Sequence, residues 1–316
     1  MGRCLSGPKG QQNEPRGRAS LRFLLPAPFP DPRFPQYVGE QEKHLRLDQP
    51  SAAVPRSVLM SRPLITVGLL LVLCTASLHA LGDAVAQGNP NQLILELVDK
   101  MPQGGGYSAT SGATRDLQSA VQVSAGRLSV TPTAARATYC SGATYLVFVQ
   151  AIQRLLPASG VGESLAQTLA IRGQPDGVGV WGRWNANGPG TACLFKELKL
   201  GRNFTSFDEA RPGDFMKIFW TNAVGAREHG HSVVYLGKES VNGVEMIRFW
   251  SSNKPNGYGR KEVPRSRISH AIFSRLEAPS NIEASVVLPH ENVYLAGLIN
   301  RESSIGEALD QSGTIR

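Results

Sequence analysis

The segment 140–156 constrains the fold of this 316-residue chain more strongly than any other part of its sequence. As a helix it would carry apolar side chains around most of its circumference, at Tyr145, Leu146, Val147, Phe148, Val149, Ile152, Leu155 and Leu156. A helix that is apolar nearly all round must be enclosed by other elements. Thr138 is a candidate N-cap, and Pro157 cannot continue the helix. We therefore expect a central helix whose first turn contains Cys140.

The order of the other elements predicts an α+β fold. Helical patterns occupy 91–101, 115–128, 162–171 and 192–201. Gly-rich stretches that we interpret as loops cover 101–114 and 172–191. From residue 214 onward the pattern changes to short strands separated by turn-forming residues, at 214–220, 231–237, 244–250 and 269–276. Helices that precede a run of hairpin-connected strands indicate N-terminal helices packed on an antiparallel β-sheet.

The N-terminal part of the chain has the composition of a leader rather than of a domain. Residues 1–59 are rich in Pro, Gly and Arg without a sustained apolar period, which predicts a disordered arm and an over-extended start. Residues 60–86 begin at Met60 and have the layout of a secretory signal peptide, with a cleavage site ending at Ala86. The alternative is a cytoplasmic arm before a signal anchor, which the short apolar run of about 10 residues disfavours.

The rest of the chain divides by pattern into three parts. We expect a helical N-terminal segment at 87–129, a catalytic domain at 130–278 and a C-terminal extension at 279–316. From residue 87 onward the chain has 23 basic and 19 acidic residues, so its charge disfavours nucleic acid as a partner. Removal of the leader would leave a secreted, periplasmic or extracellular protein with no stable membrane insertion.

The cysteines leave two possibilities open. Cys4 and Cys74 lie in the arm and the leader, so Cys140 and Cys193 remain in the mature chain. In an exported protein, two cysteines predict either one disulfide or a thiol that has a chemical role. A thiol in the first turn of a helix lies beside unpaired backbone N–H groups and the positive end of the helix dipole, and both favour the nucleophilic thiolate.

The strands provide candidate partners for this thiol. His231 is at the start of the strand 231–237, where its imidazole could accept the thiol proton. A third polar group is needed to hold the other ring nitrogen, and the next strand ends with Ser251 and Asn253, which project to the same side. The amide oxygen of Asn253 is the better acceptor, and the hydroxyl of Ser251 is the weaker one.

These residues resemble a known superfamily. The chain contains Cys140-Ser141-Gly142, then Arg211-Pro212-Gly213-Asp214-Phe215, then His231-Ser232-Val233-Val234-Tyr235-Leu236-Gly237. This order resembles that of the NlpC-type and CHAP-like papain-fold cysteine peptidases and amidases, over about 130–278. The resemblance implies a papain-like fold, hydrolysis of amide bonds in peptidoglycan stem peptides, and no cofactor or metal. It also implies a nucleophilic Cys140, a general base at His231, Asn253 or Ser251 as orienter, and a structural Asp214.

Two features depart from the superfamily pattern. Tyr139 stands where NlpC-type members commonly have Asp, and the interval from Cys140 to the Pro-Gly-Asp turn is longer than usual. Trp181, Trp184 and Trp220 are interpreted as core or cleft-lining residues, and the side chain that would hold an oxyanion is not identifiable. His229 and His231 lack a third partner for a metal site.

Two alternatives to a peptidase remain. The first is a transglutaminase-like cysteine enzyme, although such enzymes use an acidic third residue and the strand 244–250 ends without one. The second is an inactive exported binding protein with a Cys140–Cys193 disulfide.

Overall fold

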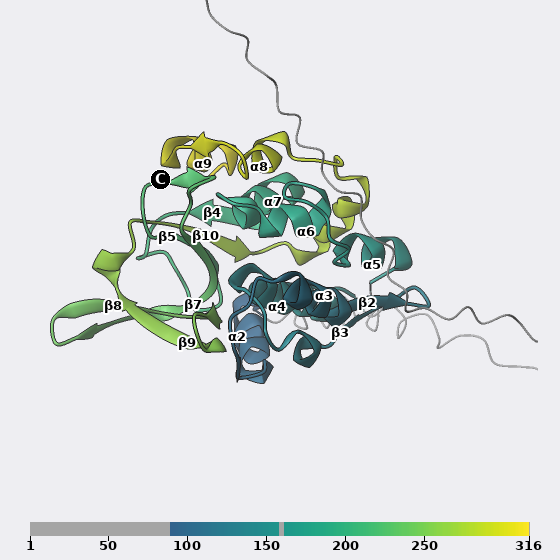
Figure 1. Ribbon diagram of the computed structural model, residues 1–316, viewed down its shortest axis with the longest axis horizontal. Coiled ribbons are helices and arrows are strands. Elements are labelled where there is room, and N and C mark those ends of the chain that lie inside the picture. Colours follow the sequence, from purple (N-terminus) through teal and green to yellow (C-terminus); the bar gives the residue numbers. More distant parts are fainter. Residues whose placement is uncertain (1–88, 158–160, 316) are drawn as a thin grey trace, which may run out of the picture. The chain divides into compact units, whose positions relative to one another are not determined.

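A computed structural model describes residues 89–157 and 161–315 (Figure 1). The arm predicted at 1–59 and the signal peptide predicted at 60–86, with Cys4 and Cys74, lie outside the described residues. Within the described ranges, no helix is both long and apolar enough to cross a membrane.

The described chain is an α+β fold, as its sequence predicts. Its α-helices are α2 Pro90–Lys100, α3 Ser111–Ala120, α4 Cys140–Leu155, α5 Glu163–Leu169, α6 Gly179–Asn185, α7 Gly190–Leu198, α8 Val293–Gly297 and α9 Ile305–Gln311. Short 3-10 helices are η1 Pro132–Ala135, η2 Arg265–Arg267 and η3 Pro279–Val287.

A seven-stranded antiparallel sheet forms the β part, in the order β1-β9-β8-β7-β5-β10-β4. Its strands are β1 Gly104–Gly105, β4 Gly201–Phe204, β5 Phe215–Phe219, β7 Gly230–Val241, β8 Val244–Asn253, β9 Gly257–Pro264 and β10 His270–Leu276. Two small sheets pair β2 Val121–Ser124 with β3 Arg127–Val130, and β6 Val224–Gly225 with β11 Glu302–Ser303.

The predicted central helix is confirmed. Eleven residues of α4 are buried: nine consecutive ones from Ser141 to Val149, and then Ala151 and Ile152. Phe148, near the middle of the helix, is fully buried. The helix packs against Phe215, Val234 and Trp250 on one face of the sheet, within a core cluster that also includes the other N-terminal helices (Figure 1). The helix begins one residue later than its pattern suggests, because Tyr139 rather than Thr138 occupies the N-cap. Cys140 is therefore the first helical residue.

The opposite face of the sheet encloses a second core. Its buried members, which include Met216, Val233, Phe249 and Phe273, come from strands and the loops that connect them. Ile268, Phe207 and Ala210, which lie outside the strands, also pack in this cluster. Strand β7, which begins at Gly230, contributes Val233 and Tyr235 to it.

Three predictions of local structure are wrong. The helix expected at 115–128 ends at Ala120, and 121–130 forms the β2–β3 hairpin, whose turn residues Ala125 and Gly126 have φ of 49° and 72°. Positive φ at both turn positions suits the twist of a two-residue hairpin loop. The turn at Ala125 and Gly126 therefore determines the structure of 121–130, and the helical period of its apolar residues does not. The loops expected at 101–114 and 172–191 contain β1 and α6. Strands β4 and β9 were not predicted.

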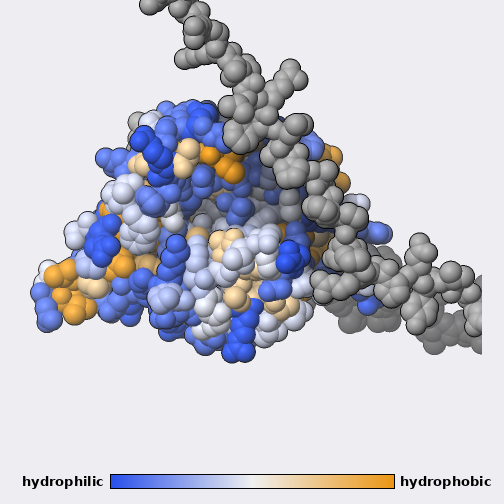
Figure 2. Space-filling model, in the orientation of Figure 1, coloured by the Kyte–Doolittle hydropathy of each residue, from blue (hydrophilic) through white to orange (hydrophobic). Residues whose placement is uncertain are grey.

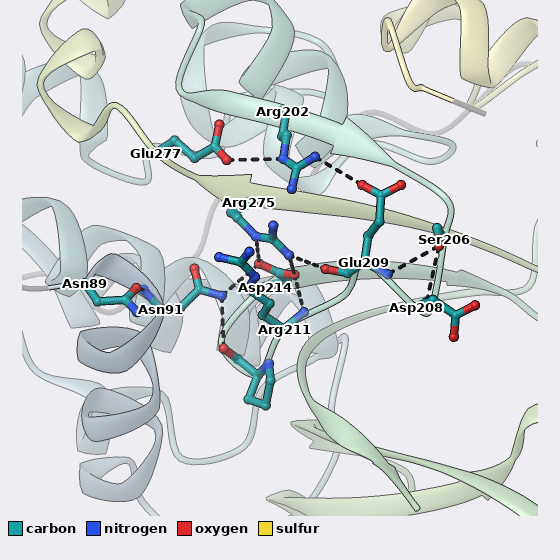
Figure 3. Close-up of polar contacts among 11 residues, drawn as sticks. Asn89, Asn91, Arg202, Ser206, Asp208, Glu209, Arg211, Asp214, Arg275 and Glu277 are labelled. Atoms are coloured by element: carbon teal, nitrogen blue, oxygen red, sulfur yellow. Dashed lines mark hydrogen bonds and ion pairs between the residues drawn. The ribbon is translucent and has the colours of Figure 1, made fainter.

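The Pro-Gly-Asp turn is built around a buried carboxylate (Figure 3). Asp214 is fully buried and accepts from Arg275 at 2.9 and 2.7 Å, from the Asn91 amide at 2.8 Å and from the Arg211 backbone at 2.8 Å. Gly213 has φ of +95°, and a Cβ there would lie 2.4 Å from the Asn91 carbonyl oxygen. The turn thus joins α2, β5 and β10, and these contacts give Asp214 a structural role.

The C-terminal residues pack onto α7 and its neighbours. Leu295 and Leu298 share a cluster with Cys193, and Ala308 packs with Ala192 and Phe219. At the tip of the β7–β8 hairpin, Val241 and Val244 are 43% and 46% exposed. Figure 2 shows an apolar patch at the left of the view, where this hairpin lies in Figure 1.

Candidate active site

Cys140 lies where the central helix starts. As the first residue of α4 its backbone N–H has no partner inside the helix, and the helix dipole is positive at this end. The first turn is fixed by a chain of hydrogen bonds: Ser141 Oγ donates to Asn185 Oδ1 at 2.7 Å, and Asn185 Nδ2 donates to Asp176 at 3.1 Å. The Trp- and Gly-rich segment that lengthens the Cys140 to Asp214 interval therefore supports the first turn of α4.

The thiol of Cys140 ionises more readily than a free cysteine. Burial by itself raises its pKa, but the hydrogen bond and the charge of His231 act in the opposite direction. The backbone N–H of Ser232 and the positive charge of Lys217 add to that effect, and together they lower the pKa from 9.0 to about 6. A thiolate is the nucleophilic form of cysteine, so this environment activates the sulfur.

His231 is held between the thiol and Asn253. The ring Nε2 lies 3.1 Å from Asn253 Oδ1, and Asn253 Nδ2 donates to the carbonyls of Ser251 at 3.2 Å and Gly259 at 2.8 Å. Because the amide nitrogen is committed to two acceptors, the amide oxygen must face the ring and accept its N–H. Nδ1 is then the ring nitrogen left to take the thiol proton.

The structure separates the two candidate orienters. Ser251 is fully buried and donates its hydroxyl to the carbonyl of Ser232 at 2.7 Å, so it ties β8 to β7. The residue that accepts a hydrogen bond from the His231 ring is Asn253, although Ser251 and Asn253 project from the same strand. Both residues follow from the sequence pattern, but the choice between them depends on how β8 is placed beside β7.

Aromatic rings enclose the imidazole. Trp220 stacks on His231 with ring centroids 6.3 Å apart, and Phe249 meets it edge-on at 5.7 Å. These rings restrict water around the His231–Asn253 hydrogen bond, which strengthens it. Trp220 therefore belongs to the site, whereas Trp181 and Trp184 are buried in the core around α4.

Tyr107 was not identified from the sequence. Burial raises the pKa of its phenol, and the negative charge of the Cys140 thiolate raises it further, so the Tyr107 hydroxyl lies close to the sulfur. Its loop is held by backbone hydrogen bonds from Tyr107 to Pro255 at 3.1 Å and from Ser108 to Thr138 at 3.2 Å. The only local signal was a tyrosine after three glycines, which is too common to indicate a role.

A buried ion pair lies close enough to influence the thiol. Lys217 Nζ is 2.6 Å from Glu228 Oε1, with side chains 13% and 2% exposed. Glu228 also accepts from the backbone N–H groups of Gly188 and Gly225, so it is held by three donors. This support fixes Lys217, whose charge contributes to the lowered pKa of Cys140.

Cys193 has no part in this arrangement. It is buried on α7 beside Leu295 and Leu298, and burial raises the pKa of its thiol to about 12. Both Cys140 and Cys193 are free thiols in the structure, so the disulfide of the binding-protein alternative is not formed.

His229 is exposed, and the described residues include no group of three or more His, Cys, Asp or Glu side chains arranged to hold a metal ion.

A cavity of about 360 Å³ opens beside the imidazole, and we call it the basic cleft. Its lining includes Tyr107, Trp220, His231 and Asn253 together with cationic side chains. A second cavity of about 410 Å³ is lined by residues of α2, β8 and β9, among them Asp99, Arg248 and Glu262.

Comparison of the chain with protein-family models, curated proteins and solved structures gave no match. The chemical interpretation therefore depends on the geometry itself. A thiol with a lowered pKa, an imidazole oriented by an amide, and two N–H or O–H donors beside the sulfur are the components of acyl transfer through a thioester.

Proposed function

We propose that this chain is a papain-like cysteine hydrolase that cleaves amide bonds. The observation that carries the proposal is the placement of His231 between the Cys140 thiol and Asn253, although ninety residues of chain separate Cys140 from His231. Structural cysteines are buried without such partners, as Cys193 is, and retain a raised pKa.

Acylation begins with proton transfer from Cys140 Sγ to His231 Nδ1. The thiolate attacks the carbonyl carbon of the amide, and the carbonyl oxygen becomes an oxyanion. The Cys140 backbone N–H, which has no partner inside the helix, and the Tyr107 hydroxyl, which lies close to the sulfur, donate to this oxyanion. The C–N bond then breaks, the imidazolium gives its proton to the departing amine, and the acyl group remains on Cys140 as a thioester.

Deacylation uses the same groups in reverse. His231 takes a proton from water, and the resulting hydroxide attacks the thioester carbonyl while the same two donors hold the oxyanion. The carbon–sulfur bond breaks, a carboxylic acid leaves, and the imidazolium returns its proton to the Cys140 thiolate. Asn253 keeps the ring in place through both stages.

Peptidoglycan stem peptides are the proposed substrate, on the strength of the sequence resemblance to NlpC-type and CHAP-like enzymes. An exported chain fits this substrate, since the polymer lies outside the cytoplasmic membrane. The transglutaminase-like alternative receives less support, because the group on His231 is the neutral amide of Asn253 rather than a carboxylate. The binding-protein alternative receives less support because both thiols are free.

The two cysteines supply a matched test. Cys140→Ala and His231→Ala are each expected to reduce hydrolysis of purified peptidoglycan by about 10³-fold or more, because each removes a group that forms or breaks a bond. Cys193→Ala is the control and should retain activity. Release of soluble peptides, followed by mass spectrometry, measures the rate and identifies the new termini. Full activity in Cys140→Ala would refute the mechanism.

A further inference from the structure

The cationic side chains of the basic cleft lack anionic partners. Lys254, Lys261 and Arg267 line it, and its lining as the structure describes it includes no Asp or Glu. All three are exposed, and none forms an ion pair with a described residue. Lys254 lies over the Tyr107 ring, with its Nζ 5.2 Å from the centroid. The cleft next to the imidazole therefore has a net positive charge.

The second cavity shows that this charge is local. There Arg260 pairs with Asp99 at 2.5 Å, Arg248 pairs with Glu239 at 3.1 Å, and Glu262 contributes a further carboxylate. Arg260 and Lys261 are neighbours on β9, yet only Arg260 has a partner. Lys261 borders both cavities. The second cavity thus contains carboxylates that offset its cations, whereas the lining of the basic cleft, as described, contains none.

We infer that the basic cleft holds a carboxylate of the peptide substrate next to the amide that is cut. This inference rests on the proposed function, since it names the substrate class of the same site. Carboxylates are the anionic groups that an unmodified peptide carries, and unpaired Lys and Arg side chains attract them. The walls formed by Trp220, Phe249 and Val263 leave room for apolar contact with the same segment. The enzyme therefore prefers acidic peptides over neutral ones.

Two alkylating reagents test the charge without requiring hydrolysis. Iodoacetate and iodoacetamide react with a thiolate at the same carbon but differ by one negative charge. The double variant Lys261→Gln/Arg267→Gln should lower the rate at which iodoacetate alkylates Cys140 by about fivefold at low ionic strength. The rate with iodoacetamide should not change. Lys254 is left intact because it contacts Tyr107. Both substituted residues are exposed, so folding should not change.

Arg127→Gln/Arg154→Gln is the matched control. Both residues are exposed, and Arg154 is 14 positions after Cys140 on α4, which places it about 21 Å along the helix. This control removes the same net charge and should leave the iodoacetate to iodoacetamide ratio unchanged. An unchanged ratio in the cleft variant, or an equal fall in the control, would overturn the inference. Slow reaction of wild-type Cys140 with both reagents at neutral pH would instead refute the proposed function.

A substrate pair extends the test to turnover. Stem peptides with free carboxylates should have a higher kcat/KM than the same peptides with those carboxylates amidated, and the cleft variant should lose the difference. Equal loss on both peptides would contradict a carboxylate site, since removal of cations should affect only the charged substrate.

Discussion

Cys140 and Cys193 lie on two helices of one core and have opposite chemical properties. The first begins α4, where an imidazole, a hydroxyl and the charge of the partly buried Lys217 act on its sulfur, and its pKa falls to about 6. The second lies inside α7 among aliphatic side chains, and its pKa rises to about 12. Burial raises the pKa of both thiols, so the difference comes from the polar groups around the sulfur.

The largest expected difference between the two thiols is in alkylation. At pH 7 Cys140 is mostly thiolate and Cys193 is almost wholly thiol, so iodoacetamide should label Cys140 at least about a hundredfold faster, even after allowing for the weaker nucleophilicity of a low-pKa thiolate. Mass spectrometry of timed samples measures both rates. His231→Ala should move the pH midpoint of Cys140 alkylation upward. Equal alkylation rates for the two wild-type thiols would contradict the difference in their pKa values.

The next effect concerns the group that orients the imidazole. Asn253→Ala should lower kcat by about ten- to a hundredfold, because His231 loses the acceptor that fixes its ring and tautomer. The pH profile of kcat/KM should change with it. Ser251→Ala is the matched control, since its hydroxyl bonds the Ser232 carbonyl rather than the ring, and it should keep the wild-type pH profile. A changed profile in Ser251→Ala alone would reverse the assignment.

The smallest effect is in stability, where the two thiols should act in opposite directions. Between pH 6 and 9 the folded chain has lost the Cys140 proton while the unfolded chain retains it, so the free energy of unfolding gains up to about 1.4 kcal/mol per pH unit as pH rises. This contribution is complete above the unfolded pKa and is lost as pH falls through about 6. Above pH 9 Cys193 stays protonated only when folded, so its contribution declines as pH rises.

Urea unfolding of the wild type, Cys140→Ala and Cys193→Ala measures these slopes. Cys140→Ala should lack the gain between pH 6 and 9, and Cys193→Ala should lack part of the decline just above pH 9. Unfolded tyrosines, with a pKa of about 10, also begin to titrate above pH 9, so the Cys193 contribution is the difference in slope between the wild type and Cys193→Ala. An unaltered slope in Cys140→Ala would show that its thiol ionises at the same pH in the folded and unfolded chain.

Elements with a strong local pattern could be predicted from the sequence. The apolar circumference of 140–156 indicated the central helix, and turn residues around alternating segments indicated β5, β7, β8 and β10. The β2–β3 hairpin was missed because four-residue strands carry too little periodicity to compete with a helical pattern. Strand β9 was missed because two glycines and three consecutive charged residues interrupt its apolar pattern, and because it depends on pairing with β8.

By itself the sequence determined that a cysteine would begin an enclosed helix and that a histidine would begin a strand, because helical and strand periodicity depend on near neighbours along the chain. The tertiary structure decided that Asn253 rather than Ser251 holds His231, that Tyr107 reaches Cys140, and that Cys193 stays apart. Those outcomes depend on strand register and on loops brought together from distant parts of the chain, which no local pattern specifies.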